Sequence, residues 1–254
     1  PAFGLHLTEN RAGQLLLSLD DIPEEIQSDS SFFAVLGNLM GKLAGEKIPV
    51  IQGLSVKPTE DQFKAMCAAG ASAGAVALFH IVGVTPEAPT LEAAFQGKQP
   101  EGEISIDINE LRRSWESLTT CQGNELDMVA LGCPHLSIEE FRELEHLVKG
   151  SQCHPEVKFL VTTNRAMLAR AESEGLVAPL KEFGAMFTLD TCILTTPMLP
   201  KPVRYIMTNS GKYSYYGPGL LNTKMVFGNL RECVDSAIEG KVVRAHNVWE
   251  GINK

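Results

Sequence analysis

The chain has 254 residues, of which 44% are hydrophobic and 21% charged, and its formal net charge at pH 7 is −9. This length gives room for one large α/β domain or two smaller ones. Because the net charge is negative and no run of Lys and Arg occurs, neither nucleic acid nor a membrane is an expected partner. No apolar stretch approaches the roughly 20 residues of a membrane-spanning helix, and no basic and apolar leader marks secretion.

The six cysteines are scattered along the chain rather than spaced as a disulfide framework. No C-x-x-C pair occurs, so neither a zinc ribbon nor a thioredoxin-like site is expected. Free thiols in a chain without an export signal are typical of a reducing compartment, and we therefore expect a cytoplasmic protein. The chain starts at Pro1 rather than at methionine, which indicates processing or a piece of a longer protein.

Apolar strand patterns and amphipathic helix patterns alternate through the first half of the chain. The expected order is a strand ending at residue 18, a glycine-rich helix at 31–45, a strand at 48–54, a helix at 59–74, a strand that starts at 75 and runs into a proline-rich loop ending at 90, a strand at 103–108 and a helix at 109–118.

The second half continues the alternation. Its expected elements are a strand at 128–131, a helix opened by the capping box of Ser137 and Glu140, a strand at 157–163, a helical stretch at 164–184 interrupted near Gly175, strands at 185–192 and 204–210, a loop at 211–219, a strand at 224–228 and a helix at 229–240. This order predicts an α/β fold with a largely parallel sheet flanked by helices, and a boundary between two subdomains near 97–102.

The junction "LGCPHLS" places Cys133 and His135 between a buried strand and an amphipathic helix. In open α/β sheets ligands bind at the carboxyl ends of the strands. A helix N-terminus lowers the pKa of a nearby thiol, so Cys133 is a candidate thiolate. The alternative is that Cys133 is a small buried hydrophobe and His135 caps the loop.

Two further cysteines lie near strand ends. Cys192 ends the strand "AMFTLDTC", and Cys233 lies early in the helix after "VFGN". If these two meet Cys133 at one edge of the sheet, they form a three-thiolate site that suits an iron–sulfur cluster with one open iron. The alternative is that all three are inert buried thiols. Cys67, on an Ala-rich helix, is expected in the core.

Polar side chains form two more candidate groups. His80 lies in a strand, with Thr85 and Glu87 just beyond it, and could orient a carboxylate or carry a proton; a hydrogen-bonded core histidine is the alternative. Ser210 and Lys212 lie in the expected loop and suit an anionic substrate, unless the lysine is simply solvated. No Walker A, G-x-S-x-G, H-E-x-x-H or G-x-G-x-x-G motif occurs.

Seven segments, taken together, resemble the large catalytic part of the aconitase X proteins. They are "GLHLTENR", "PVIQGL", "SAGAVALFHIVGVTPEAPT", "VALGCPHLS", "LDTC", "TNSGKYSYYGPG" and "NLRECVDSAIEG", and they span nearly the whole chain. The family is similar to aconitase, and its members include bacterial cis-3-hydroxy-L-proline dehydratases and archaeal mevalonate 5-phosphate dehydratases. The resemblance implies an aconitase-like fold and a hydro-lyase that removes water from a small hydroxylated carboxylate.

The resemblance also implies roles for individual residues. A [2Fe–2S] or [4Fe–4S] cluster would be held by Cys133, Cys192 and Cys233. His80 and Lys212 would be catalytic, and the substrate would be bound by Thr85, Glu87, His135 and Ser210.

The sequence departs from the family pattern in its extent. Family large subunits carry a T-C-x-P-Y segment and an E-S-S-A-rich segment before "GLHL", and a small swivelling subunit or domain completes their site. None of these occurs here, so residues 1–254 are expected to form part of a catalytic domain, inactive alone and not necessarily able to hold the cluster alone. A smaller departure is Gly211, where alanine is more usual.

Three functions remain open at this point. The preferred substrate is cis-3-hydroxy-L-proline, because six Cys and eight Met with a modest charged fraction are typical of mesophiles rather than archaeal hyperthermophiles. The alternative is the large subunit of a mevalonate 5-phosphate dehydratase. An alternative of another class is a non-catalytic α/β domain that docks a partner through its exposed sheet edge.

Overall fold

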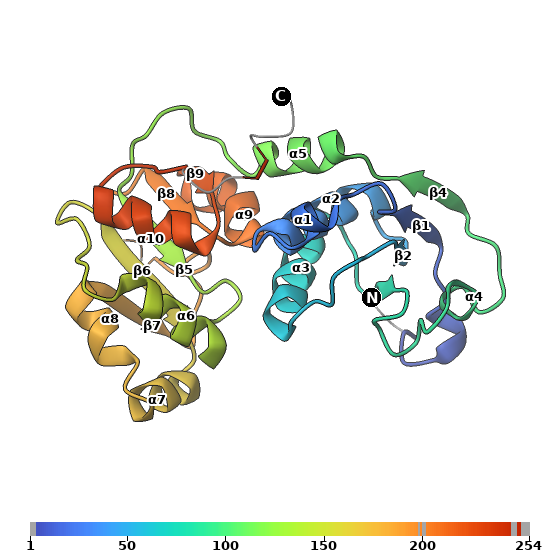
Figure 1. Ribbon diagram of the computed structural model, residues 1–254, viewed down its shortest axis with the longest axis horizontal. Coiled ribbons are helices and arrows are strands. Elements are labelled where there is room, and N and C mark those ends of the chain that lie inside the picture. The colour runs from blue at the N-terminus through green and yellow to red at the C-terminus, as the bar shows by residue number, and fades with distance from the viewer. Residues whose placement is uncertain (1–3, 198, 200–201, 245–247, 250–254) are drawn as a thin grey trace. The chain divides into compact units, whose positions relative to one another are not determined.

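The computed structural model describes residues 4–197, 199, 202–244 and 248–249. It divides into two compact units, Pro1–Ser114 and Trp115–Lys254, whose elements Figure 1 labels. Strands and helices alternate as predicted, but the strands form two parallel sheets rather than one. The predicted boundary at 97–102 lies inside the first unit, just before a strand that pairs with that unit's sheet.

The first unit contains a four-stranded sheet in the order β3-β2-β1-β4, with every pair parallel. Its strands are β1 (Leu15–Ser18), β2 (Pro49–Gln52), β3 (His80–Ile81) and β4 (Gly102–Ser105). Its helices are the 3₁₀ helix η1 (Thr8–Asn10), α1 (Glu24–Gln27), α2 (Phe32–Ala44), α3 (Glu60–Ala73) and α4 (Leu91–Ala94), and α5 (Ile108–Ser117) crosses into the second unit.

The second unit contains a five-stranded sheet in the order β7-β6-β5-β8-β9, again with every pair parallel. Its strands are β5 (Met128–Leu131), β6 (Lys158–Thr163), β7 (Ala185–Leu189), β8 (Tyr205–Thr208) and β9 (Lys224–Phe227). Its helices are α6 (Ile138–Val148), α7 (Arg165–Ser173), α8 (Val177–Phe183), α9 (Gly211–Leu221) and α10 (Leu230–Glu239).

In each sheet, successive strands are added first on one side of the starting strand and then on the other side, and the point between the two sides is the switch point. In the second unit the chain adds β6 and β7 on one side of β5 and then returns to add β8 and β9 on the other side. In the first unit β2 and β3 lie on one side of β1, and β4 lies on the other. Open α/β sheets bind ligands at such a switch point, outside the carboxyl ends of the strands. The ends of β5 and β8 therefore define where a ligand is expected in the second unit.

Both faces of the second sheet are covered. Side chains that point alternately to the two faces of its strands are buried in two separate cores. One face packs against α6, α7, α8 and α10, and we call its buried side chains the helix-covered core. The other face packs against α9 and the segment after β7, and we call its buried side chains the α9 core. Within β5, Val129 and Leu131 belong to the first core, whereas Met128 and Ala130 belong to the second.

Helix α9 replaces the loop predicted at 211–219. The glycines and the proline of "GKYSYYGPG" are typical of a loop. Gly217 instead serves close packing, since a Cβ at this position would lie 2.3 Å from the Met225 sulfur of β9. Pro218 lies within the helix, which begins from a side-chain cap at Ser210. Packing against β9 therefore outweighs the local preference for a turn.

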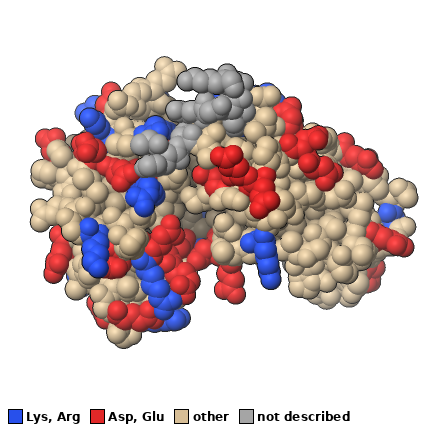
Figure 2. Space-filling model, in the orientation of Figure 1, with Lys and Arg blue, Asp and Glu red and all other residues tan. Residues whose placement is uncertain are grey.

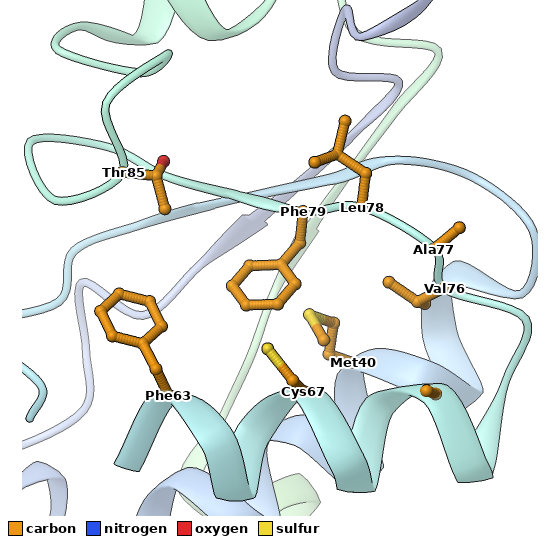
Figure 3. Close-up of a pocket in the computed structure, with 9 residues that line it drawn as sticks. Met40, Phe63, Cys67, Val76, Ala77, Leu78, Phe79 and Thr85 are labelled. Carbon is orange, nitrogen blue, oxygen red and sulfur yellow. The ribbon is translucent and has the colours of Figure 1, made fainter. Parts of the chain in front are cut away.

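The strand predicted to start at residue 75 is also shorter than expected. Only His80 and Ile81 pair with β2, and the segment before them lines an apolar cavity of about 370 Å³ (Figure 3). Cys67 of α3 lies at this cavity and is exposed, so its predicted place in the core is wrong. The cavity is lined by Met40, Phe63, Cys67, Ala71, Val76, Ala77, Leu78, Phe79 and Thr85.

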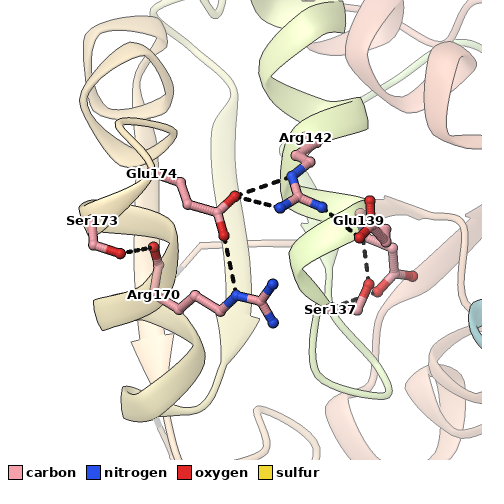
Figure 4. Close-up of polar contacts among 7 residues, drawn as sticks. Ser137, Glu139, Arg142, Arg170, Ser173 and Glu174 are labelled. Atoms are coloured by element: carbon pink, nitrogen blue, oxygen red, sulfur yellow. Dashed lines mark hydrogen bonds and ion pairs between the residues drawn. The ribbon is translucent and has the colours of Figure 1, made fainter.

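An exposed network of ion pairs joins α6 to α7 (Figure 4). Two guanidinium nitrogens of Arg142 lie 3.1 and 2.6 Å from one carboxylate oxygen of Glu174, and Arg170 reaches its other oxygen at 3.1 Å. Arg142 also pairs with Glu139 at the start of α6. Exposed pairs contribute little singly, but these share the Arg142 guanidinium and so connect the first turn of α6 to the end of α7.

The distribution of surface charge and the length of the helices bear on possible partners. On the face shown in Figure 2, Lys and Arg side chains are scattered among Asp and Glu rather than gathered in a basic patch. In the described part of the chain, no helix is long and apolar enough to cross a membrane.

Stability is expected to fall at alkaline pH through Cys153. Burial raises the pKa of this thiol from 9.0 to about 11, and the thiol donates a hydrogen bond to the Val157 carbonyl at 3.3 Å. Because the folded-state pKa is the higher one, the contribution is present below pH 9 and is lost as pH rises towards 11. In Cys153→Ser, which keeps a donor, the loss of unfolding free energy between pH 8 and 10.5 should be about 1 kcal/mol smaller, after allowance for solvent screening. Urea unfolding under reducing conditions measures it, and identical pH profiles for the two proteins would contradict it.

Candidate active site

The junction after β5 is fixed tightly against β6. Gly132 has φ of +90°, and a Cβ there would lie 2.0 Å from the Thr162 carbonyl oxygen. The Leu136 amide donates to that carbonyl at 3.1 Å, and the Thr163 hydroxyl donates to the Leu136 carbonyl at 3.0 Å. The backbone around Cys133 is therefore held on both sides, at the carboxyl end of the strand where it was predicted.

His135 connects this junction to the segment after β7. Its Nε2 lies 3.3 Å from the Thr191 carbonyl oxygen, and Thr191 directly precedes Cys192. The next residues, Ser137 and Glu140, form the predicted capping box that starts α6. The histidine thus lies beside both cysteine-bearing segments.

The segment after β7 has its own anchors. Asp190 adopts φ of +53°, its amide donates to the Thr163 carbonyl at 3.0 Å, and its carboxylate lies 2.6 Å from Nε of Arg165. The hydrogen bonds to Arg165 lower the pKa of the Asp190 carboxyl. The Thr196 hydroxyl donates to the Cys192 carbonyl at 2.9 Å. These contacts hold Cys192 at the same edge of the sheet as Cys133.

Cys133 and Cys192 lie together against the α9 core, and both are partly buried. Burial raises the pKa of the Cys133 thiol to about 11; the Lys212 ammonium acts in the opposite direction, and Cys192 raises the pKa further. Burial outweighs the neighbouring Lys212 ammonium, which disfavours the expected thiolate at neutral pH.

Ser210 and Lys212 approach Cys133 from the far side of the switch point. Ser210 is the N-cap of α9, and its hydroxyl accepts a hydrogen bond from the Tyr213 amide at 3.0 Å. The same hydroxyl donates to the Cys133 carbonyl at 2.5 Å. Because its one proton is used in this bond, the arrangement does not favour the predicted donation from Ser210 to a substrate. Lys212 lies in the first turn of α9, and its ammonium is close enough to Cys133 to lower the pKa of that thiol.

Tyr213 is a member of this group that sequence reasoning missed. It is 2% exposed, and its hydroxyl lies 3.4 Å from the Thr162 hydroxyl. Burial raises its pKa, and the neighbouring Cys133 and Cys192 raise it further. The glycines around Tyr213 predict a loop, and helical spacing from the Ser210 cap is the signal that points to the helix instead.

Cys233 does not join the other two cysteines. It lies in α10 and is fully buried in the helix-covered core, on the opposite face of the sheet from Cys133 and Cys192. Burial is the main cause of its raised pKa, and Glu232 raises it further. Among the residues that the structure describes, no group of three or more His, Cys, Asp or Glu side chains is placed to hold a metal ion. The chain thus brings together two of the three predicted ligands.

The other three predicted site residues lie in the first unit. His80 is 2% exposed, and its Nε2 lies 2.7 Å from the Arg11 carbonyl oxygen. The Thr85 hydroxyl accepts from the Ile81 amide at 2.9 Å and donates to the Ile81 carbonyl at 3.1 Å. Glu87 forms a two-pronged ion pair with Arg11, which lowers the pKa of this carboxyl. Each contact stabilises the segment around β3, as the structural alternative for His80 anticipated.

Two parallel α/β units, one of them with thiols and an ammonium at the switch point of its sheet, have the architecture of α/β proteins that bind a ligand at the carboxyl ends of their strands. Models of aconitase X domains match both units: the second domain matches residues 13–116 and the third domain residues 126–239. The chain belongs to the aconitase X family.

Relatives and a solved structure agree with this assignment. The chain is 38% identical over 252 residues to a cis-3-hydroxy-L-proline dehydratase of Pseudomonas aeruginosa, covering 98% of this chain and 43% of that protein. It is 33% identical over 243 residues to the phosphomevalonate dehydratase large subunit of Methanosarcina mazei, covering 96% of this chain and 56% of that protein. Its fold matches the holo-form of Thermococcus kodakaraensis aconitase X with a TM-score of 0.79 at 25% identity, over 93% of this chain and 58% of that one.

A second cis-3-hydroxy-L-proline dehydratase, from Hypocrea jecorina, is 40% identical over 244 residues, which covers 94% of this chain and 41% of that protein. The chain thus spans about half the length of the curated relatives that it matches.

The Cys133 junction should not tolerate a side chain at Gly132. In Gly132→Ala the Cβ would overlap the Thr162 carbonyl and occupy a left-handed backbone conformation, so we expect a loss of about 3 kcal/mol in unfolding free energy. Gly219→Ala in α9 is the matched control, because no atom lies within 4 Å of its added Cβ. Equal urea-unfolding midpoints for the two variants would contradict the expected strain.

Proposed function

We propose that this chain forms part of the catalytic domain of an iron–sulfur hydro-lyase that dehydrates a small hydroxylated carboxylate. The observation that carries the proposal is the pairing of Cys133 and Cys192 with Lys212 at the switch point of the second sheet. Relatives that match nearly the whole chain are named dehydratases, which supports the reaction class.

The donor set fits part of a cluster site. Cys133 and Cys192 supply two soft thiol ligands in a half-buried setting, the ligand type that iron–sulfur clusters take. Cys233 lies behind the sheet, so we replace it with a third ligand from outside this chain, such as the T-C-x-P-Y segment of the family large subunits. When bound, a cluster with an open iron supplies a Lewis acid for the departing hydroxyl group.

The chain's own residues bind and orient the substrate. Lys212 offers an ammonium to a carboxylate or phosphate beside the thiols, and we assign it this role in place of Ser210. His135, whose Nε2 faces the Thr191 carbonyl, keeps the two cysteine-bearing segments adjacent and presents its imidazole to the same edge. His80, Thr85 and Glu87 stay candidates by family resemblance, although their present hydrogen bonds favour structural roles in the first unit.

The preferred substrate is cis-3-hydroxy-L-proline. The two relatives that carry this name are 38% and 40% identical to the chain, against 33% for the phosphomevalonate dehydratase large subunit. Mevalonate 5-phosphate is the alternative, and Lys212 suits its phosphate equally well. A small swivelling subunit or domain would complete the site, and the free thiols favour a reducing, cytoplasmic setting.

Anaerobic reconstitution with iron and sulfide tests the ligand set. A small dithiol in excess can complete the coordination left open by the two cysteines. We expect bound iron and visible absorption in the wild-type chain and in Cys233→Ser, and at most a tenth of that iron in Cys133→Ser or Cys192→Ser, because removing either thiol leaves one protein ligand.

Iron counting and visible spectra measure the result, with unfolding midpoints as the control for folding. Uptake that depends on Cys233, or that survives the loss of Cys133, would overturn the proposed ligand set. A folded wild-type chain that takes up no iron in the presence of the dithiol would favour the docking domain instead.

A further inference from the structure

We propose that Ser210 is a positioning residue, whose hydroxyl fixes the Cys133 backbone to the start of α9 across the switch point. The inference deepens the proposed function and rests on it for the purpose of the arrangement, since Cys133 is there a cluster ligand. The contact itself involves only residues of this chain.

Both halves of the Ser210 hydroxyl are engaged. It donates its proton to the Cys133 carbonyl at 2.5 Å and accepts the Tyr213 amide proton at 3.0 Å. Its own amide donates to the Thr208 hydroxyl at 3.1 Å, and the residue is 6% exposed. A buried hydroxyl with one donor and one acceptor bond to two different segments acts as a fixed link between them.

The link lies where the sheet no longer connects these segments. Backbone pairing of β5 with β8 covers Met128 with Ile206 and Val129 with Met207. Cys133 lies four residues beyond Val129, the last residue of β5 that pairs with β8, where strands of a twisted sheet diverge. The Ser210 bond therefore sets the position of the Cys133 sulfur relative to Lys212, which belongs to the same first turn of α9.

The amount of ordering can be measured without a metal. In Ser210→Ala the junction should open more often, and the rate of Cys133 alkylation by N-ethylmaleimide should rise about fivefold, the factor expected for one hydrogen bond in a local opening equilibrium. Cys153, whose surroundings Ser210 does not touch, should react at the wild-type rate. Peptide mapping by mass spectrometry reports both thiols in one sample.

Because Ser210→Ala also removes the N-cap of α9, Asn164→Ala, which removes the N-cap of α7, is the matched control for the loss of a helix cap. Asn164 caps α7 by accepting the Met167 amide at 2.8 Å but has no bond to the Cys133 segment in the contacts that the structure describes. We expect it to lower the unfolding midpoint about as much as Ser210→Ala and to leave Cys133 alkylation unchanged. Ser210→Thr, which keeps the hydroxyl, should restore the wild-type rate.

A second variant separates the two bonds and guards against misfolding. Ser210→Asp keeps an acceptor for the Tyr213 amide, as aspartate is a good cap, but as a carboxylate it has no proton for the Cys133 carbonyl. Hydrogen exchange of the backbone amides of residues 133, 135 and 136 should therefore be faster in Ser210→Asp than in the wild-type chain. The inference is overturned if Ser210→Ala and Asn164→Ala give the same Cys133 rate, or if exchange in Ser210→Asp stays at the wild-type level.

Failure of the proposed function would look different. If the wild-type chain takes up no iron but Ser210→Ala still exposes Cys133 selectively, the link stands and the cluster assignment falls. If the wild-type chain takes up iron and the serine variants do not differ in reactivity from Asn164→Ala, the cluster assignment stands and the link falls.

Discussion

Parallel pairing of the strands in the second sheet is the constraint on which the candidate site depends. Because β5, β6, β7 and β8 all point the same way, the segments that follow them emerge at one edge. Those segments carry Cys133, Asp190, Cys192 and Ser210, which are spread over much of the sequence of this unit. The pairing in turn requires that both faces of the sheet be covered, which the helix-covered core and the α9 core achieve.

The two cores also decide which thiols can share a ligand. Cys133 and Cys192 pack against the α9 core, whereas Cys233 is a well-packed member of the opposite core. A β-sheet and its side chains separate the two positions, and the α10 thiol has no route to the edge that does not unpack buried residues. Of the three cysteines predicted as ligands, two therefore lie at the same edge of the sheet and the third does not.

Much of this fold follows from local sequence signals. The capping box at Ser137, the buried strand before Gly132 and the alternation of strands and helices all predict what the structure contains, and they place Cys133 correctly at a strand end. The prediction went wrong where packing between distant segments decides the outcome. Gly217 permits close contact with Met225, which no local rule reveals, so local signals predict a loop in place of α9 and do not single out Tyr213.

The face on which a helix residue lies is a similar case. Strand ends reveal which edge a residue belongs to, but the face covered by α10 depends on how the chain crosses the sheet, so the sequence does not reveal on which face Cys233 lies.

The most direct measurement is cross-linking of the reduced chain, prepared without metal, with dibromobimane, a short reagent that bridges two adjacent thiols. Mapping should find Cys133 joined to Cys192 and neither joined to Cys233. A bridge between Cys133 and Cys233, or the absence of a bridge between Cys133 and Cys192 in the folded chain, would contradict the shared site.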